Sequence, residues 1–461
     1  MSVGARTGSV MEAIRSQIAS RALVAGEKLP SIRAFAGSMQ VSPSTVVEAY
    51  DRLAAEGVIF ARRGAGFYVS DVAQPFSVSK VEPKLDRNVD PFWVSRQSLD
   101  ADSAFAKPGC GWLPADWMPV APLRRALRGL ARGDDALLSD YGDTRGFSDL
   151  RRLLARQFAD EGLPADTDQI LLTSCGTQAI DLICRLLLKP GDAVLVDDPC
   201  YFNFQAILRA HQVAAVGVPM THSGPDMPQF ERTVAQVKPR LYLTNSALHN
   251  PTGAALTPQI AHRILKVAAT HGLIIVEDDI FSAFEPDPSP RLASLDGLNQ
   301  VIRIGSFSKT LSASVRCGYI AARPDWVEVL IDLQIATNFG GPSPLAAHIV
   351  FAALSDGSYR KHLEALRIRL ARSRLQVSEK LGLLGIAPWL MPRGGFYLWC
   401  LLPEGVSAAG FAQRALTNKI VLAPGNVFSV SQGMDRFMRF NVSQMSDDAI
   451  YETLRRTMLE V

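Results

Sequence analysis

Apolar residues recur with a helical period in the first seventy residues and with mixed periods from about residue 100 onward. Near the N-terminus, Val10, Ile14 and Ile18 fall on one helical face, and Val46 and Tyr50 fall on another. Together with breaks at glycine and proline, these patterns predict helices at residues 9–22, 32–39 and 44–56. Two short apolar runs predict strands at residues 58–60 and 67–69.

From about residue 101, short apolar runs alternate with helical segments. Buried strands are expected at residues 170–173, 193–196, 213–218, 241–244, 273–276 and 301–304. This alternation predicts a mostly parallel sheet with helices on both faces, in which ligands bind beyond the carboxyl ends of the strands. A smaller α+β domain should follow, with a long helix at 359–381 and strands at 395–399 and 437–442.

The order of the N-terminal elements is helix, short helix, turn, helix and two-stranded ribbon, which is typical of a winged helix-turn-helix. The segment that follows is polar, contains three prolines and shows no helical period. A flexible chain of roughly 30 residues spans about 30 Å. We therefore expect a multidomain protein, divided into a winged helix-turn-helix (1–72), a linker (73–100), a large α/β domain (101–345) and a small C-terminal domain (346–461).

Composition narrows the class of protein. The chain has 461 residues and a formal net charge of only +3, so nucleic-acid binding would require a local basic patch. The six cysteines contain no C-x-x-C pair, which predicts reduced thiols and no metal site. We find no leader-like segment and no apolar run of about 20 residues, so the expectation is a cytoplasmic protein without a membrane span.

Three phrases in the first sixty residues carry a family resemblance: GEKLPSIR at 26–33, VSPSTV at 41–46 and YDRLAAEG at 50–57. They are similar to the DNA-binding domain of the GntR family. The resemblance implies contacts with double-stranded DNA from Arg33, Ser42, Ser44, Thr45, Arg62, Arg63 and Gly66. Pro43 stands where family members often carry a basic residue. The alternative is a winged helix that binds protein.

The residues from 306 to 319 carry the strongest chemical signal. Lys309 follows a predicted strand end, where its amine can form a Schiff base with an aldehyde cofactor. Ser306, Ser308 and Arg316 can bind a phosphate group. A solvated surface lysine beside a surface arginine is the plainer alternative. The pattern Ser-x-Ser-Lys-x(6)-Arg-x-Gly-Tyr resembles the lysine motif of pyridoxal-phosphate (PLP) aminotransferases of the aspartate-aminotransferase fold, which implies PLP as cofactor and Lys309 as the catalytic residue.

Other residues at strand ends extend this resemblance. The backbone amides at Gly176 and the Thr177 hydroxyl open a helix and suit a phosphate, although a simple strand–helix turn would look the same. The resemblance implies that Asn250 donates to the ring hydroxyl of PLP and that Asp278 pairs with the pyridine nitrogen. It also implies that Tyr201 stacks on the ring, although a tyrosine here could equally belong to the core.

The resemblance also implies two roles at the edges of the site. Tyr141 would reach the phosphate held by a neighbouring subunit, and Arg439 would bind a substrate carboxylate. The plainer alternatives are an ordinary turn at Tyr141 and a surface arginine on an edge strand. Ile280 and Phe281 occupy positions where the family usually has a tyrosine, which removes one contact to the ring hydroxyl.

A GntR-like head joined to an aminotransferase-like body resembles the MocR subfamily of bacterial regulators. The resemblance implies a PLP-binding transcriptional regulator that senses an amino compound or PLP itself, and that forms a domain-swapped homodimer. An alternative is a working aminotransferase with an accessory DNA-binding domain. A third is a dimeric scaffold that has lost its cofactor.

Overall fold

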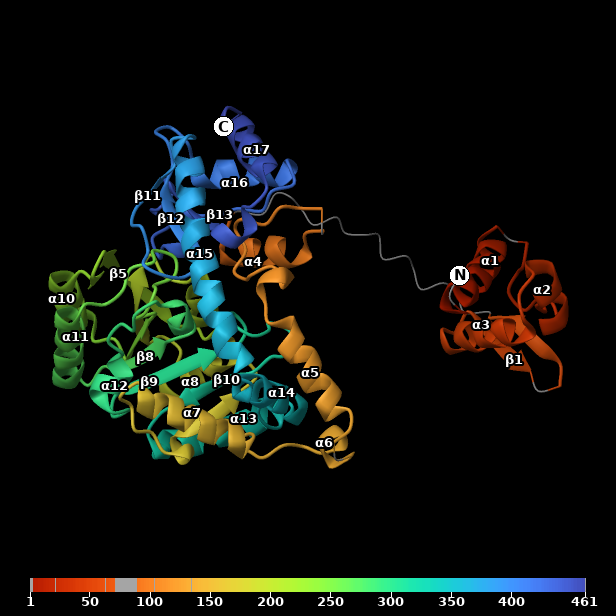
Figure 1. Cartoon of the computed structure of the whole chain (residues 1–461), viewed down its shortest axis with the longest axis horizontal. Coiled ribbons are helices and arrows are strands. Elements are labelled where there is room, and N and C mark those ends of the chain that lie inside the picture. Colours follow the sequence, from red (N-terminus) through yellow and green to blue (C-terminus); the bar gives the residue numbers. More distant parts are fainter. Residues whose placement is uncertain are drawn as a thin grey trace. The chain divides into compact units, whose positions relative to one another are not determined.

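The computed structural model describes residues 3–20, 22–62, 64–70, 89–102, 104–133 and 135–460. The chain divides into two compact units, Met1–Asp86 and Arg87–Val461, which we call the head and the body (Figure 1). Most of the predicted linker, residues 73–88, lies outside the described residues.

The head has the expected order of elements. These are α1 (Val3–Ala19), α2 (Ile32–Met39), α3 (Pro43–Ala55), β1 (Ile59–Arg62) and β2 (Gly66–Val69). Ser31 and Ser42 cap α2 and α3, because each side chain accepts a hydrogen bond from a backbone N–H of the first turn. Val46, Tyr50 and Leu53 are buried in one core with residues of the other elements.

The first helix begins six residues earlier than its apolar period predicts. Thr7 is fully buried, and its hydroxyl donates to the Glu48 carboxylate on α3. This tertiary contact extends the helix into a segment whose own sequence has no apolar period. The helix also ends at Ala19, three residues before the predicted end.

The body is built on an eight-stranded sheet in the order β3-β10-β9-β8-β7-β4-β5-β6. Its strands are β3 (Ile170–Thr173), β4 (Ala193–Asp198), β5 (Ala214–Thr221), β6 (Gly224–Pro225), β7 (Leu241–Thr244), β8 (Ile274–Asp278), β9 (Val301–Ser306) and β10 (Gly318–Ala321). Strand β10 runs antiparallel to both β3 and β9, whereas β5, β4, β7, β8 and β9 pair in parallel. The prediction of a mostly parallel sheet is confirmed.

Helices cover both faces of this sheet. One hydrophobic core contains α7 (Ser148–Asp160), α10 (Met227–Val237), α11 (Pro258–His271), α12 (Leu292–Asp296) and α14 (Pro344–Ser355). The core on the other face contains α8 (Gly176–Leu187), α9 (Phe202–Ala210) and α13 (Pro324–Asn338). The peripheral helices are α5 (Val120–Leu130) and α6 (Asp135–Ser139). The domain boundary expected after residue 345 falls inside α14. Because α14 packs in the core on one face of the large sheet, it belongs with the large domain.

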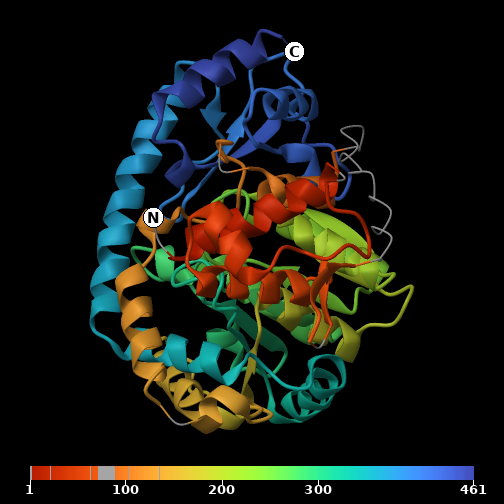
Figure 2. The ribbon, with the colours of Figure 1, turned by 90° about the vertical axis from the view of Figure 1, so that its right-hand side faces the viewer.

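A second sheet forms the small C-terminal part, in the order β11-β12-β14-β13. Its strands are β11 (Ala387–Pro388), β12 (Tyr397–Leu401), β13 (Ala423–Pro424) and β14 (Phe437–Asn441), and its helices are α15 (Ser358–Gly382), α16 (Ala408–Thr417) and α17 (Asp448–Met458). The long helix α15 runs along the body from the large domain to the small one (Figures 1 and 2). The predicted α+β architecture is therefore present.

The expected linker is wrong in its last ten residues, which form helix α4 (Pro91–Asp100). Asp90 caps this helix, and Pro91 occupies its first position. Trp93 and Val94 are buried in the core of the small domain. The helix is short, and it is held by tertiary packing rather than by a strong apolar period, so the sequence pattern did not reveal it.

Candidate functional site

A cavity of about 290 Å³ lies beyond the carboxyl end of β8, as expected for a sheet of this kind; we call it the cofactor cavity. Residues from nine separate segments form its wall. The predicted site residues in this wall are Gly176, Thr177, Tyr201, Asn250, Asp278, Ser308, Lys309, Arg316 and Arg439. The fold therefore brings together residues that lie up to 263 positions apart in the sequence, between Gly176 and Arg439.

Lys309 follows β9 on a short loop and enters the cavity. Its Nζ donates a hydrogen bond of 2.7 Å to the carbonyl oxygen of Gly111. Burial lowers the pKa of this amine to about 8, and the positive charge of Arg439 contributes to the lowering. A larger fraction of the amine is therefore neutral near pH 8, which is the nucleophilic form.

Asp278 is the last residue of β8 and is 6% exposed. Its Oδ1 accepts a hydrogen bond of 3.2 Å from the Ile280 N–H, and Asn245 donates to its backbone carbonyl. Burial raises the pKa of the carboxyl to about 7. A buried carboxyl with this pKa responds strongly to a cationic or N–H donor placed beside it.

Arg439 lies on β14, which has strands on both sides, so the alternative of a surface arginine on an edge strand is excluded. Its side chain is 1% exposed. Nη1 donates to the Asn250 Oδ1 at 2.9 Å, and Nη2 donates to the Gly109 carbonyl at 2.9 Å. The guanidinium stacks 4.1 Å from the ring of Tyr397, and Nε has no hydrogen-bond partner among the described residues. The arginine is therefore held in place while its Nε–H lacks an acceptor in the described part of the chain.

A second group of wall residues offers hydrogen-bond donors suited to an anion. Cys175 caps α8, so the N–H groups of Gly176 and Thr177 lie in its first turn. Ser308 and Arg316 come from the lysine loop. Arg316 has a positive φ of 54°, and no ion pair involves it within the described parts of the chain. Its charge is available for a ligand.

Two predicted cofactor residues lie outside the wall of this cavity. Ser306 lies behind Ser308, and its hydroxyl donates to the Cys317 carbonyl at 3.2 Å. Tyr141 is 80% exposed and packs edge-on against Phe339. A role for Tyr141 at a neighbouring subunit stays a prediction.

Sequence reasoning missed three segments of the wall, one of which is Tyr397 of β12. Ser95, Ser98 and Leu99 of α4 line the cavity, as do Gly109 and the neighbouring residues Gly111 and Trp112. A Cβ added to Gly109 would lie 2.4 Å from the backbone carbon of Leu422. The phrase Pro-Gly-Cys-Gly-Trp at 108–112 was the available signal, because paired glycines often mark a close approach of the backbone.

In the head, the predicted DNA contacts differ in exposure. Arg33, Ser42, Ser44, Arg62 and Gly66 lie at least partly at the surface. Arg62 lies 4.7 Å from the ring centroid of Tyr68 and 5.4 Å from that of Phe60, so the β-ribbon supports its side chain.

Two of the remaining predictions have other outcomes. Thr45 is only 7% exposed, and its hydroxyl lies 2.8 Å from the Ser42 Oγ at the start of α3. The side chain therefore helps to begin the helix and presents little surface to DNA. Arg63 lies outside the described residues.

Metal sites and membrane spans are both absent from the described residues. No group of three His, Cys, Asp or Glu residues there could hold a metal ion. No helix in the described ranges is long and apolar enough to cross a bilayer. The six cysteines are all buried and free.

Comparison with known families agrees with this geometry. Residues 114–456 match the aminotransferase class I and II family, and residues 6–69 match the bacterial regulatory proteins of the gntR family. The chain belongs to the aminotransferase class I and II family and, with its gntR domain in front, has the architecture of MocR-type regulators. The gntR domain implies DNA binding, and the aminotransferase domain implies PLP.

Particular relatives share nearly the whole chain. It is 30% identical to YdcR of Escherichia coli K12, an uncharacterised HTH-type transcriptional regulator, over 94% of both chains. It is 26% identical to the HTH-type transcriptional regulator NorG of Staphylococcus aureus, covering 92% of this chain and 98% of NorG. Among solved structures, the α-aminoadipate aminotransferase LysN of Thermus thermophilus, complexed with N-(5'-phosphopyridoxyl)-L-leucine, superposes with a TM-score of 0.72 at 25% identity, over 79% of this chain and 93% of LysN.

Proposed function

We propose that the protein is a transcriptional regulator that binds DNA through its head and PLP through its body. The observation that carries this proposal is the meeting of Lys309, Asp278, Asn250 and Arg439 in one cavity of a chain that also has a gntR domain. The relatives named as HTH-type transcriptional regulators, which match over more than nine tenths of the chain, support it.

The donor set of the cofactor cavity fits PLP at each end. Lys309 supplies the amine, and Arg316, Ser308 and the first turn of α8 supply donors for the phosphate. The Asp278 carboxyl would meet the pyridine nitrogen, and its raised pKa would fall once a protonated nitrogen lies beside it. Bound PLP supplies an aldehyde for primary amines and a ring that accepts electrons.

The proposed effector is a small amino compound that carries a carboxylate, or PLP itself. Lys309 would hold the aldehyde, which binds primary amines, and Arg439 would hold the effector's carboxylate with its unpartnered Nε. An effector acts as a switch only if it binds one arrangement of the protein more tightly than another.

We propose a homodimer as the DNA-binding form. Tyr141, Leu138 and Phe339 are all more than half exposed on the large domain, which suits burial against a second copy. One head carries few basic side chains, so two heads on one dimer would raise affinity by increasing effective concentration. Head and body would then divide the work, with residues 1–72 on DNA and the rest on the ligand.

Aminotransferase activity is the second candidate, because LysN carries that activity in its name and the cavity contains both an amine and a carboxylate-binding arginine. Ile280 and Phe281 line the cavity without a hydroxyl group. The ring oxygen of PLP would therefore have one donor fewer, which favours weak turnover. A single-turnover assay with a panel of amino acids separates the two candidates, since rapid conversion to the pyridoxamine form would favour the enzyme.

The test of the regulator is footprinting on the DNA upstream of the chain's own coding region, with and without PLP and candidate amino acids. We expect protection of paired half-sites and a ligand-dependent change in the wild type. The Lys309→Ala variant should keep the protection and lose the response to ligand. An unchanged response in that variant would remove PLP chemistry from the mechanism. If added PLP produces no visible absorbance in the protein, the result would support the alternative of a dimeric scaffold that has lost its cofactor.

A further inference from the structure

A second cavity, of about 780 Å³, lies on the other side of the loop that carries Lys309; we call it the rear cavity. It is larger than the cofactor cavity, which has about 290 Å³. The end of α7, the loop after β8, the end of β9 and the first turns of α15 form its walls. None of the roles proposed above uses this space.

The two cavities share a wall. Asp278 and Lys309 face the cofactor cavity, whereas the residues that follow them, Asp279 and Thr310, face the rear cavity. Ile280 borders both cavities. A molecule in the rear cavity would therefore contact the backs of the two segments proposed to hold PLP.

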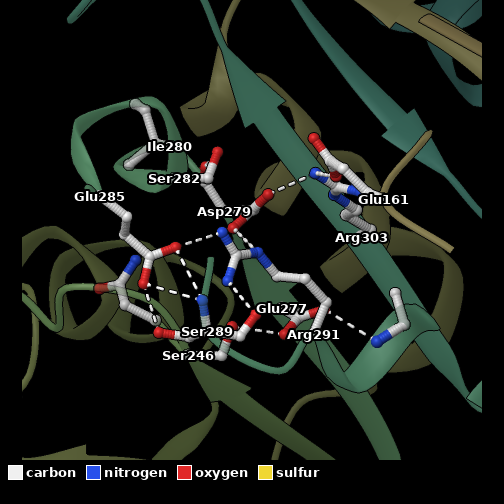
Figure 3. A network of polar contacts seen from close by, with 12 residues as sticks. Glu161, Ser246, Glu277, Asp279, Ile280, Ser282, Glu285, Ser289, Arg291 and Arg303 are labelled. Carbon is white, nitrogen blue, oxygen red and sulfur yellow. Dashed lines mark hydrogen bonds and ion pairs between the residues drawn. The ribbon is translucent and has the colours of Figure 1, made fainter. Parts of the chain in front are cut away.

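Charged groups of the rear cavity pair with one another (Figure 3). The ion pairs are Asp279–Arg291 at 2.7 Å, Asp279–Arg303 at 2.5 Å, Glu161–Arg303 at 2.6 Å, Glu285–Arg291 at 2.5 Å and Glu285–Arg393 at 2.6 Å. Three carboxylates thus meet three guanidinium groups, of which that of Arg393 lies beside the wall. The other two charged wall residues, Asp160 and Arg367, are opposite in sign, so the charges remain balanced. An ionic ligand would disturb this balance, because a buried charge without a partner is costly.

The nearby Glu277 does not upset the balance. It accepts hydrogen bonds from the N–H groups of Leu292 and Ala293 and from the Ser246 hydroxyl. Burial, together with the negative charge of Asp279, raises the pKa of its carboxyl. Glu277 therefore does not need a cationic group of a ligand to balance its charge.

The walls nevertheless contain polar atoms that lack partners. Arg303 is 1% exposed, and its Nε and Nη1 have no hydrogen-bond partner among the described residues; the Ser294 Oγ has none either. The Arg303 guanidinium lies 4.5 Å from the ring centroid of Phe158, and the rings of Phe307 and Tyr359 also line the cavity. Buried N–H donors without acceptors are costly, and aromatic walls suit a flat apolar ligand.

We propose that the rear cavity binds an uncharged aromatic molecule bearing a carbonyl or carboxamide oxygen, which accepts from Arg303 or Ser294. Occupancy then changes the surroundings of the cofactor across the shared wall. The binding step does not depend on the function proposed above. Only the effect on the cofactor rests on it.

Three probes of similar shape and different charge test the binding step: benzamide, benzoate and benzyltrimethylammonium. Each is titrated into full-length, PLP-free protein and followed by saturation-transfer NMR. We expect saturable binding of benzamide and at least about tenfold weaker binding of the two ions, because either ion would add an unpaired buried charge to walls whose own charges are balanced. No saturable benzamide binding, or equal binding of all three probes, would overturn the proposal.

Amino-acid substitutions test whether benzamide binds in the rear cavity. Leu295 lies on the wall and is 58% exposed, so Leu295→Trp narrows the cavity with little risk to folding. Leu383, which is 88% exposed and outside the wall, gives the matched control Leu383→Trp. Arg303→Lys keeps the positive charge and removes the guanidinium donors. Benzamide affinity should fall about tenfold in Leu295→Trp and Arg303→Lys and stay unchanged in the control. Unchanged affinity in both wall variants would place the probe elsewhere and refute the site.

The visible absorbance of bound PLP measures whether a ligand in the rear cavity affects the cofactor cavity. With PLP added, benzamide should shift the visible absorbance of the wild-type protein and leave that of Leu295→Trp unchanged. Benzamide that binds without shifting the absorbance would refute the coupling alone. If PLP never binds, the proposed function fails, while the benzamide titration still decides the site. Displacement of PLP by benzamide would show that the probe occupies the cofactor cavity and would overturn the proposal.

Discussion

Asp278 and Asp279 are neighbours at the end of β8, yet only one of the two carboxyl groups is paired with a cation within the described residues. Asp278 faces the cofactor cavity, makes no ion pair within the described residues, and has its pKa raised to about 7 by burial. Asp279 faces the rear cavity between two guanidinium groups, those of Arg291 and Arg303. One carboxyl is left for a ligand, and the other is already paired by the fold.

The difference shows how to separate a binding group from a structural one. A buried ion pair satisfies both of its members, so removing either one leaves an uncompensated charge. A buried ionisable group without a partner is held at a cost that a ligand can relieve, and such groups concentrate at functional sites. Four predictions test this comparison, beginning with the largest expected effect.

The first prediction concerns the amine on the cofactor side. Lys309→Ala should abolish covalent retention of PLP, because the other polar groups in the wall cannot form the bond. Borohydride reduction followed by mass spectrometry measures it. Lys361→Ala, which alters an exposed lysine on α15, is the control and should retain the label fully. A label that persists in Lys309→Ala would move the site to another lysine.

The second prediction sets the two acids against each other. Asp279→Asn should lower the free energy of unfolding of the body by about 3–5 kcal/mol, because it leaves two buried arginines partly unpaired. At pH 4.5, where the folded carboxyl is neutral, Asp278→Asn should change the free energy of unfolding little. Urea denaturation of the PLP-free proteins measures both changes. Equal losses would show that the two sides of the strand do not differ as described.

The third prediction is a pH dependence with a definite sign. Folded Asp278 keeps its proton to about pH 7, whereas a carboxyl in the unfolded chain loses it near pH 4. Between these values the unfolded state binds fewer protons, so stability falls as pH rises, by up to about 4 kcal/mol for this group. The difference in urea midpoint between wild type and Asp278→Asn should therefore change from pH 4.5 to pH 7. A constant difference across that range would contradict the raised pKa.

The smallest effect is expected in the head, where the candidate contacts are exposed. Arg62→Ala should weaken binding to the footprinted DNA severalfold and reduce the salt slope by about one, as for the loss of one phosphate contact. Arg15, which pairs with Glu56 at 2.5 Å, gives the control Arg15→Ala. Fluorescence anisotropy at several salt concentrations separates them. Equal losses in both variants would indicate a general effect of charge.

Local motifs revealed much of the molecule in advance. The lysine loop, the strand ending in Asp278 and the phrase around Asn250 each carry their signal within a few consecutive residues, so the cofactor cavity could be predicted. The strands of the large sheet were equally clear, because they are buried on both faces and consist of short apolar runs.

What escaped prediction depends on contacts between distant segments. Helix α4 is fixed by the burial of Trp93 against the small domain, and Thr45 is buried beside Ser42 at the start of α3. Arg303 interrupts an apolar strand, and its partners Glu161 and Asp279 come from other elements. Sequence spacing contains no sign of such pairings, so the rear cavity could not be predicted.

Helix α4 lies both at the start of the described body and in the wall of the cofactor cavity. Within the described residues it is the first helix of the body, and Ser95, Ser98 and Leu99 on it form part of the cofactor cavity's wall. The Asn426 side chain holds the Val89 carbonyl just before it at 3.3 Å. A ligand in the cofactor cavity that contacts Leu99 therefore also contacts α4, the helix whose first residue lies two positions after Val89 and its hydrogen bond to Asn426.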